Sequence, residues 1–321
     1  MSRTRIPGEV LDAAHERAAA RARRDWPEAD RLRGVIEAAG WRIVDRGTDF
    51  ALSPATPPTI EEAGAVRYGA SADVPSRLTE SPTTDATVVL IATDFPEDVT
   101  RAVTAVRENC AGQLNVDLVI VADGPSVEQD AALDSLDASA EVVRTSARLG
   151  TGAAWNIGIR RARAAIVVLM DTSVEPTGDV VGPLLAGLED PSVAVAGGWG
   201  LVSSDLRKFE DAPPGDVDAI EAYLMAFRRA DAVERGPVDE RFRFYRNLDI
   251  WWSLVLRDEG EDRPPRRAVA VDVPAIRHEH RGWTSVPDDE RARLSKRNFY
   301  RIIDRFGHRP DLASAGEPDR S

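Results

Sequence analysis

Three aspartates follow three short apolar segments, at positions where the strands of an α/β sheet would end. They are Asp94, Asp123 and Asp171, and the apolar segments before them are 87–92, 117–122 and 166–170. Aspartate also favours the turns and helix N-caps that follow strands, so each one alone has a structural explanation. Together on one sheet edge they predict a site for a polar ligand, and Asp171 could supply an oxygen ligand to a divalent cation.

The elements that must position these aspartates alternate between apolar strands and amphipathic helices from Ala86 onward. We expect strands at 87–92, 117–122, 141–144 and 166–170, and helices at 97–109, 127–136 and 153–164. This alternation is typical of a parallel sheet covered by helices on both faces, and right-handed crossovers bring the carboxyl ends of its strands to one edge. The sequence therefore predicts an α/β fold with a ligand site at that edge.

The composition of the 321-residue chain excludes several classes of protein. Lys and Arg number 41 and Asp and Glu 54, and the net charge of −13 disfavours a broad basic face for nucleic acid. Cys110 is the single cysteine, which excludes an intramolecular disulfide and a cysteine-based structural zinc site. Because no apolar run reaches the ~18 residues of a membrane span and the N-terminus has no apolar leader, we expect no membrane span and a cytoplasmic protein.

The glycine-containing segment Gly150-Thr151-Gly152 is not a dinucleotide-binding fingerprint. It has two of the three glycines, places Trp155 where a small residue should pack, and follows the third predicted strand instead of the first. Two interpretations remain open. The loop could point backbone N–H groups of the following helix at a phosphate, or the two glycines could serve a tight turn.

Five segments in sequence order carry a resemblance to a known family. They are 87–93, 119–124, 149–162, 166–176, and 239–242 together with 248–260. Residues 86–282 resemble a family 2 glycosyltransferase with the GT-A fold, a Rossmann-like α/β domain that binds nucleotide sugars. The segment 166–176 resembles the strand that delivers the DxD metal motif, and 248–260 resembles the acceptor-side helix that begins with a Glu-Asp pair.

The resemblance implies a role for individual residues of this chain. The donor nucleotide would contact Thr93, Asp94, Asp123, Gly150 and Asn156, and Asp171 would hold a divalent cation, Mn²⁺ or Mg²⁺. The departing diphosphate gains negative charge, which either a metal on Asp171 or positive side chains could meet, namely Arg277, His278, His280 and Arg281. Of these we expect Arg277 at the diphosphate and His278 and His280 as further metal ligands. The chain departs from the family pattern at two positions, because Ser173 replaces the second carboxylate of DxD and Leu248 replaces the acidic neighbour of Asp249.

Asp249 is the residue that the resemblance makes the catalytic base. Inverting transfer is a direct displacement in which one carboxylate takes the proton of the acceptor hydroxyl. A retaining double displacement would need a second, nucleophilic carboxylate close by, which the sequence does not clearly offer. A structural alternative exists, since a carboxylate in the first turn of a helix is favoured by the helix dipole.

Several other side chains near the end of the domain allow two interpretations. His278 and His280 lie two apart in a strand-like segment and would share a face, where they could complete a site with Asp171, donate to a phosphate, or play a structural part. Tyr245 and Arg246 could line the acceptor side or belong to a surface loop. Three tryptophans could be core residues or a sugar-stacking platform, namely Trp251, Trp252 and Trp283.

Residues 1–55 predict a separate module. Helices are expected at 10–24 and 28–39 and a hairpin of strands at 41–45 and 50–52, and the stretch resembles the C-terminal helical region of cysteinyl-tRNA synthetases. No synthetase active-site motif accompanies it, which excludes aminoacylation. Its arginine-rich face could bind RNA, recruit a protein partner or simply be solvated.

The remaining boundaries complete the prediction. Residues 56–85 read as a proline-rich linker with one short strand at 65–68, residues 283–308 as a helix that packs on the 86–282 domain, and 309–321 as a disordered tail. We expect an inverting glycosyltransferase that moves a sugar from a nucleotide-diphosphate donor to a hydroxyl acceptor. The alternative is a catalytically silent GT-A-like binding protein whose N-terminal module recruits RNA or a protein partner.

Overall fold

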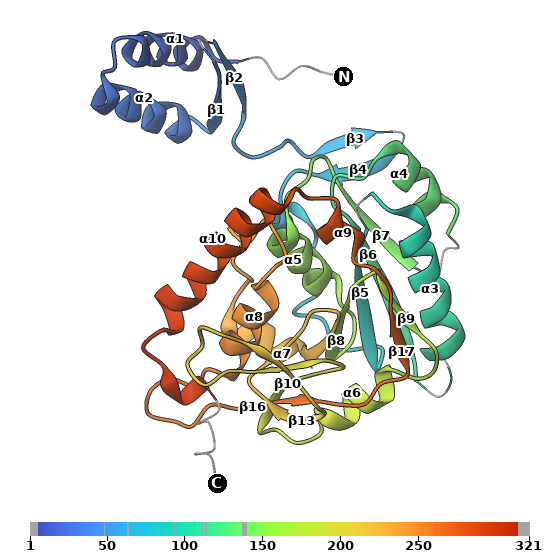
Figure 1. The fold of residues 1–321 in the computed structure, drawn as a ribbon. Coiled ribbons are helices and arrows are strands. Elements are labelled where there is room, and N and C mark those ends of the chain that lie inside the picture. The colour runs from blue at the N-terminus through green and yellow to red at the C-terminus, as the bar shows by residue number, and fades with distance from the viewer. Residues whose placement is uncertain are drawn as a thin grey trace.

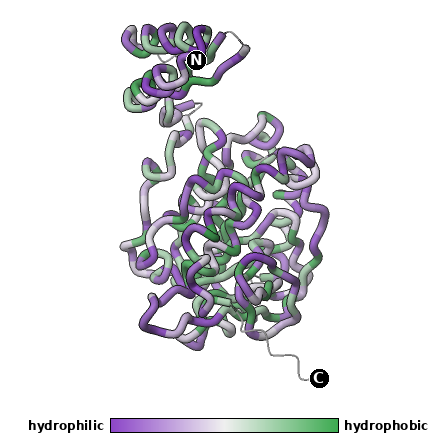
Figure 2. The backbone as a smooth tube through the Cα atoms, turned by 60° about the vertical axis from the view of Figure 1, so that its left-hand side comes forward, coloured by the Kyte–Doolittle hydropathy of each residue, from purple (hydrophilic) through white to green (hydrophobic). Residues whose placement is uncertain are grey.

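The computed structural model describes residues 6–47, 49–62, 64–92, 94–110, 112, 114–136 and 140–313. A large α/β unit carries most of these residues, and a small N-terminal module stands apart from it in both views (Figures 1 and 2). Thr93, a predicted contact of the donor nucleotide, lies outside the described residues.

A ten-stranded mixed sheet forms the centre of the large unit, in the order β13-β16-β10-β15-β8-β5-β6-β7-β4-β3. The four predicted strands are β5 (Ala86–Ala92), β6 (Val116–Ala122), β7 (Ala140–Thr145) and β8 (Ile166–Met170). They pair in parallel, which confirms the predicted arrangement and places their carboxyl ends together. The other strands are β3 (Ile60–Glu62), β4 (Ala65–Tyr68), β10 (Val193–Gly197), β13 (Gly215–Val217), β15 (Leu224–Arg228) and β16 (Arg267–Ala270).

Helices cover both faces of this sheet (Figure 1). They are α3 (Pro96–Cys110), α4 (Val127–Asp134), α5 (Thr151–Arg161), α6 (Val181–Gly187), α7 (Arg229–Arg235) and α8 (Leu248–Arg257). Successive residues of a strand point to opposite faces, so Val89 packs in the core under α5 and α8, while Leu90 packs in the core under α3 and α6. Burial on both faces explains why the strands are apolar throughout.

The segment 56–85 differs from the predicted linker. Strand β4 pairs in parallel with β7, and β3 pairs antiparallel with β4, so the main sheet includes residues before Ala86. A single 3₁₀ turn follows, η1 (Ser71–Asp73), and Val74 is buried. The prolines mark bends around these short strands rather than a free connection, because Pro is compatible with edge strands and turns.

Small sheets and the C-terminal helices complete the large unit. Strand β17 (Ala275–Arg277) pairs with β9 (Val174–Pro176), and β11 (Gly200–Val202) lies between β12 (Glu210–Ala212) and β14 (Ala219–Ile220). Helix α9 (Arg281–Thr284) leads into α10 (Asp288–Phe306), which buries Ile302 and Phe306 against the core.

The tail predicted to be disordered begins with ordered structure. Residues Pro310–Leu312 form the 3₁₀ turn η2, and the Leu312 side chain is completely buried. Arg309 pairs with Asp258 and Asp311, which fixes the chain where disorder was expected to start. The polar composition did not reveal this one apolar anchor, and residues 314–321 lie outside the described residues.

The N-terminal module contains the predicted helical hairpin and β-hairpin. Its elements are α1 (Gly8–Ala22), α2 (Trp26–Ala38), β1 (Trp41–Arg46) and β2 (Asp49–Pro54). They enclose a small core of their own, which includes Val10, Leu32 and Ile36. Part of the predicted basic face is neutralised, because Arg17 and Arg21 both pair with Asp45. No helix in the described part of the chain is long and apolar enough to cross a membrane.

Candidate active site

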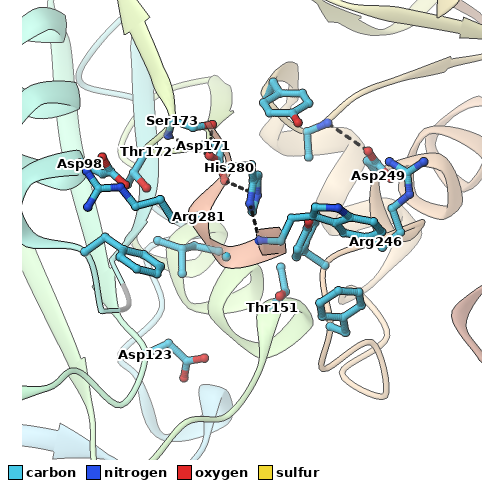
Figure 3. A pocket seen from close by; sticks show the side chains of 18 of the residues that line it. Asp98, Asp123, Thr151, Asp171, Thr172, Ser173, Arg246, Asp249, His280 and Arg281 are labelled. Carbon is cyan, nitrogen blue, oxygen red and sulfur yellow. Dashed lines mark hydrogen bonds and ion pairs between the residues drawn. The ribbon is translucent and has the colours of Figure 1, made fainter. Parts of the chain in front are cut away.

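A pocket of about 810 Å³ opens at the carboxyl ends of β5, β6 and β8, where the sequence predicted a ligand site. Its walls come from these strand ends, from the segment 221–223 before β15, from the segment 243–249 that enters α8, and from α9. Figure 3 shows the carboxylates of Asp123, Asp171 and Asp249 around this space. Three of the predicted site residues also line it, namely Asp94, Gly150 and His280.

Asp171 and His280 form a close pair in the pocket (Figure 3). His280 Nε2 lies 3.3 Å from Asp171 Oδ2, and His280 Nδ1 accepts the backbone N–H of Trp283 at 3.1 Å. Because Nδ1 is an acceptor, the imidazole proton stays on Nε2 and faces the carboxylate. Burial alone would lower the pKa of His280, but the hydrogen bond and charge of Asp171 outweigh it and raise the pKa.

Asp171 is held in its ionised form by its neighbours. Ser173 donates its backbone N–H at 2.8 Å and its hydroxyl at 2.5 Å to Asp171 Oδ1. Burial favours a higher pKa for Asp171, yet the contacts with His280 and Ser173 dominate and lower it. Asp171 therefore presents a charged carboxylate, and the serine at the second DxD position fixes its orientation.

The carboxylate of Asp171 fits a divalent cation, whereas His280 would have to lose the Nε2 proton that faces Asp171 to bind the same ion. A carboxylate oxygen and an imidazole nitrogen 3.3 Å apart are spaced like neighbouring ligands of one ion bound at ~2.1–2.2 Å. Among the described residues, no group of three or more His, Cys, Asp and Glu side chains could hold a metal. A cation here would have to take further oxygens from its ligand, as ions in phosphate sites do.

His278 does not join this pair, contrary to the prediction that both histidines share a face. Strand β17 ends at Arg277, so the alternation of a strand does not extend through 278–280. His278 Nε2 lies 2.6 Å from Glu175 Oε2, and His278 is not part of the pocket wall. His280 enters the pocket because it caps the N-terminus of α9.

Asp249 lies on the other side of the segment 221–223 from Asp171. Its Oδ2 accepts the backbone N–H of Ala222 at 3.2 Å, while the backbone N–H of Asp171 donates to the carbonyl of Tyr223 at 3.0 Å. Asp249 Oδ1 accepts the N–H of Ile250 at 2.9 Å, so each oxygen keeps a lone pair. Burial raises the pKa of Asp249 despite these bonds and the positive charge of Arg246.

Glu221 is a pocket carboxylate that the sequence did not single out. Burial and then the charge of Asp249 raise its pKa, so the two acids lie within each other's field. Arg277 donates to Glu221 Oε2 at 3.1 Å, and its guanidinium lies 4.0 Å from the ring centroid of Tyr223. Arg277, the predicted diphosphate contact, is thus outside the pocket wall and supports Glu221 and Tyr223 from behind.

Asp123 organises the loop before α5. Its two oxygens accept the backbone N–H groups of Leu149 at 2.7 Å and Gly150 at 2.9 Å. Burial nevertheless raises the pKa of Asp123. Asp94 lies at the rim and pairs with Arg148 at 2.5 Å. Asp123, a predicted contact of the nucleotide, therefore also holds the loop that contains the tight turn at Gly150.

Asn156 has a structural role that the sequence did not reveal. Its Nδ2 donates to Val238 O and Glu240 Oε1, both at 2.9 Å, and its Oδ1 accepts the N–H of Val238 at 2.8 Å. Asn156 is buried and does not line the pocket. The amide fastens α5 to the segment 238–240, away from the pocket wall, and the contact with the donor nucleotide stays a prediction.

Aromatic rings line one part of the pocket wall. The ring of Tyr245 stacks on His280 with centroids 4.4 Å apart and an angle of 18°. Trp283 lies beside Phe244, with centroids 6.3 Å apart. Trp251 and Trp252 are buried in the core, so Trp283 is the only one of the three predicted tryptophans in the described pocket wall.

Comparison with known families gives a match for part of the large unit. Residues 87–237 match the family model for glycosyl transferase family 2. This glycosyltransferase segment contains Asp94, Asp123, Asp171 and Glu221. It ends before Asp249 and His280, so those two residues join the site through the fold beyond the matched segment.

Two solved glycosyltransferases share the fold of the chain. GalNAc-T7, crystallised with UDP, GalNAc and Mn²⁺, matches with a TM-score of 0.54 and 15% identity over 69% of this chain and 48% of its own. The mannosyltransferase PcManGT from Pyrobaculum calidifontis, in complex with GDP-Man and Mn²⁺, matches with a TM-score of 0.51 and 16% identity over 75% of this chain and 70% of its own. These likenesses confirm the GT-A fold.

The N-terminal segment is similar to a different protein. It is 51% identical over 47 residues to the cysteine–tRNA ligase of Rubrobacter xylanophilus, and 44% identical over 50 residues to that of Opitutus terrae. The matches cover 15% and 16% of this chain but only 10% and 11% of the ligases, so the chain spans about a tenth of these relatives. The glycosyltransferase segment has no part in them.

Proposed function

We propose that this chain is an inverting glycosyltransferase that moves a sugar from a nucleoside-diphosphate donor to a hydroxyl acceptor. The observation that carries the proposal is the placement of Asp171 with His280 on one side of the segment 221–223 and Asp249 on the other. The family match and the shared GT-A fold support a glycosyltransferase. The donor class and the stereochemistry are our extension.

The nucleoside would bind at the end of the pocket formed by Asp94, Asp123 and Gly150. Both oxygens of Asp123 already accept backbone N–H groups, and the Thr145 hydroxyl lies 3.3 Å from Oδ1, so Oδ2 keeps a lone pair for a donor group of the base or ribose. Arg243 lies against Gly150 and lines the same pocket, so its charge would meet the phosphates. Thr93 stays a prediction for this end.

Asp171 would hold a divalent cation at the diphosphate, and His280 would join it through Nε2 only after that nitrogen loses the proton that faces Asp171. Such a cation, Mn²⁺ or Mg²⁺, supplies positive charge to the departing diphosphate. Both fold relatives were crystallised with Mn²⁺, which supports this assignment. The chain's own contribution is to keep Asp171 ionised through Ser173 and to fix the His280 ring through Trp283 and Tyr245.

Asp249 would act as the general base. The acceptor oxygen bonds to the anomeric carbon, the bond from that carbon to the diphosphate oxygen breaks with its electron pair, and the acceptor proton passes to Asp249. Burial raises the pKa of Asp249, which makes its carboxylate a stronger base than an exposed aspartate. Glu221 is engaged by Arg277, which leaves Asp249 as the carboxylate for this step.

A thermal-shift screen tests the proposal without knowledge of the acceptor. UDP, GDP and their sugars, each with and without Mn²⁺ or Mg²⁺, should raise the Tm of the protein, since ligand at 100 times its Kd adds ~2.7 kcal/mol of stability. Asp171→Asn should abolish the metal-dependent part, and the exposed control Asp272→Asn should not. No shift with any nucleotide would contradict the proposal, and RNA binding in its place would favour the silent alternative.

A further inference from the structure

Two arginines in the pocket wall, Arg243 and Arg246, have no carboxylate partner among the described residues. Arg148 pairs with Asp94, and Arg281 pairs with Glu97 and Asp98. In the described part of the chain, Arg243 and Arg246 form no ion pair, although several carboxylates line the same pocket. Arginines that stay unpaired in an acidic protein leave positive charge available to a ligand.

Hydrogen bonds with α10 hold the backbone beside these arginines. Asn298 of α10 donates through its side-chain nitrogen to the carbonyls of Phe244 at 2.8 Å and Arg246 at 2.9 Å. Asn247 adopts a left-handed conformation with φ 69° and donates to the carbonyl of Ser295 at 3.0 Å. The positions from which the guanidinium groups enter the pocket are therefore fixed by α10.

The two arginines serve different ends of the pocket. A side chain at Gly150 would collide with Arg243, whose Cα would lie 2.6 Å from the added Cβ, so Arg243 belongs to the Asp123 and Gly150 end. Arg246 lies beside Asp249 (Figure 3), and its guanidinium carbon is 5.7 Å from the Trp283 ring centroid. Asp123 lies at the opposite end of the pocket in the same view.

We infer that the acceptor carries a carboxylate or phosphate group and that Arg246 recognises it beside the base. This inference rests on the proposed function, since it assumes that Asp249 marks the acceptor end. A guanidinium is planar and binds either oxyanion through two parallel hydrogen bonds, and that of Arg246 lies over the Trp283 ring. Placing the anion next to Asp249 brings the neighbouring hydroxyl of the same molecule to the base.

Calorimetric titration separates this inference from the proposed function. Glycerol, glycerate and glycerol 3-phosphate are titrated into the full-length protein loaded with Mn²⁺ and UDP or GDP, whichever the protein binds. We expect at least one of the two anions to bind about 10- to 100-fold more tightly than glycerol. Arg246→Gln should remove that preference for anions. Arg246→Lys keeps the positive charge but lacks the two parallel N–H donors of the guanidinium, so it should restore part of the preference.

Two variants serve as controls. Arg241→Gln removes an arginine from the same segment that is exposed and paired with Asp239 outside the pocket, and it should keep the preference for anions. Arg243→Gln should weaken nucleotide binding instead. The inference is overturned if both anions bind no more tightly than glycerol, or if Arg246→Gln and Arg241→Gln behave alike while nucleotide binding is intact. Failure to bind any nucleotide would overturn the proposed function, and this inference with it.

Discussion

The reactivity of Asp249 depends on how few groups stabilise its charge. It accepts two backbone N–H groups, from Ala222 and Ile250, and lies near the positive charge of Arg246. Burial outweighs all three and raises its pKa. Asp171 has the opposite balance, because His280 and Ser173 lower its pKa. The two aspartates are therefore suited to different tasks, proton uptake at Asp249 and charge presentation at Asp171.

Replacing Asp249 should separate chemistry from binding. Asp249→Asn keeps the size of the side chain but cannot take a proton, so we expect kcat to fall about 10²- to 10⁴-fold while the Kd of the donor stays within about threefold. Steady-state transfer kinetics and donor titrations measure the two quantities. Asp272→Asn, an exposed position outside the pocket, is the control. Normal turnover by Asp249→Asn would rule out its assignment as the base.

The raised pKa of Asp249 predicts a pH dependence with a definite sign. The base is active only when ionised, so kcat/KM should rise with pH, and the midpoint of this rise should lie above the ~3.9 of an ordinary aspartate. Since Arg246 lowers the pKa of Asp249, Arg246→Gln should move the midpoint to higher pH. The pH profiles of both proteins measure this shift, and a downward shift in Arg246→Gln would contradict it.

The sequence could place aspartates at the site but not the interactions that assign their roles. Asp94, Asp123 and Asp171 end parallel strands, so topology alone brings them to one edge. Asn156 and His278 lie outside the pocket wall because their partners, the segment 238–240 and Glu175, depend on packing that spacing cannot reveal. Glu221 had no signal, since it lies between two short strands with no motif of its own.

At the level of elements, the turn from β7 into α5 joins the Asp123 end of the pocket to the segment that leads to Asp249. Gly150 has φ 101° and lies so close to Arg243 that a Cβ atom would be 2.6 Å from the Arg243 Cα. The N–H of Gly152 donates to the carbonyl of Phe242 at 2.9 Å. The turn at Asp123 is thereby fastened to the segment that carries Tyr245 and Arg246.

Gly150→Ala should be costly for two separate reasons. Positive φ costs a non-glycine residue ~1–3 kcal/mol, and overpacking against Arg243 adds a similar amount. Gly236→Ala is the matched control, because it has φ 82° but no atom within 4 Å of an added Cβ. Thermal denaturation should give a clearly lower Tm for Gly150→Ala than for Gly236→Ala. Equal Tm values for the two variants would show that the contact with Arg243 adds nothing to the cost of the Gly150→Ala substitution.

The hydrophobic periodicity of the sequence identified most helices and strands, but it did not identify both strands at the β3–β4 edge of the main sheet. The helices and strands from 86 to 170 appear within a few residues of their predicted bounds, because apolar strands and amphipathic helices differ in period. The edge strands β3 and β4 lie in a proline-rich stretch that resembles a linker. Their pairing with β7 is a long-range contact, which local composition does not encode.

For the whole molecule, we propose a boundary between the N-terminal module and the large unit near residues 55–59. The module encloses its own core around Leu32, Ile36 and Trp41, and it stands apart in both views (Figures 1 and 2). Its similarity to cysteine–tRNA ligases is confined to this part of the chain. We regard it as a docking module whose partner does not complete the pocket.

Deletion of residues 1–55 should leave the catalytic unit intact. Since no described residue of the module lines the pocket, we expect unchanged donor affinity and a Tm change of less than about 3 °C, which corresponds to less than ~1 kcal/mol. Donor titration and calorimetry of the truncated protein test this. Loss of donor binding in a folded, truncated protein would mean that the module belongs to the site.

The most direct test of the account is the anomeric configuration of the product. The protein is incubated with Mn²⁺, a panel of nucleotide sugars and the anionic and neutral acceptors, and the released sugar or glycoside is followed by NMR before mutarotation. A single base at Asp249 predicts that the first product has the anomeric configuration opposite to that of the donor. Retention of configuration, or no transfer and no hydrolysis with any donor, would contradict the account.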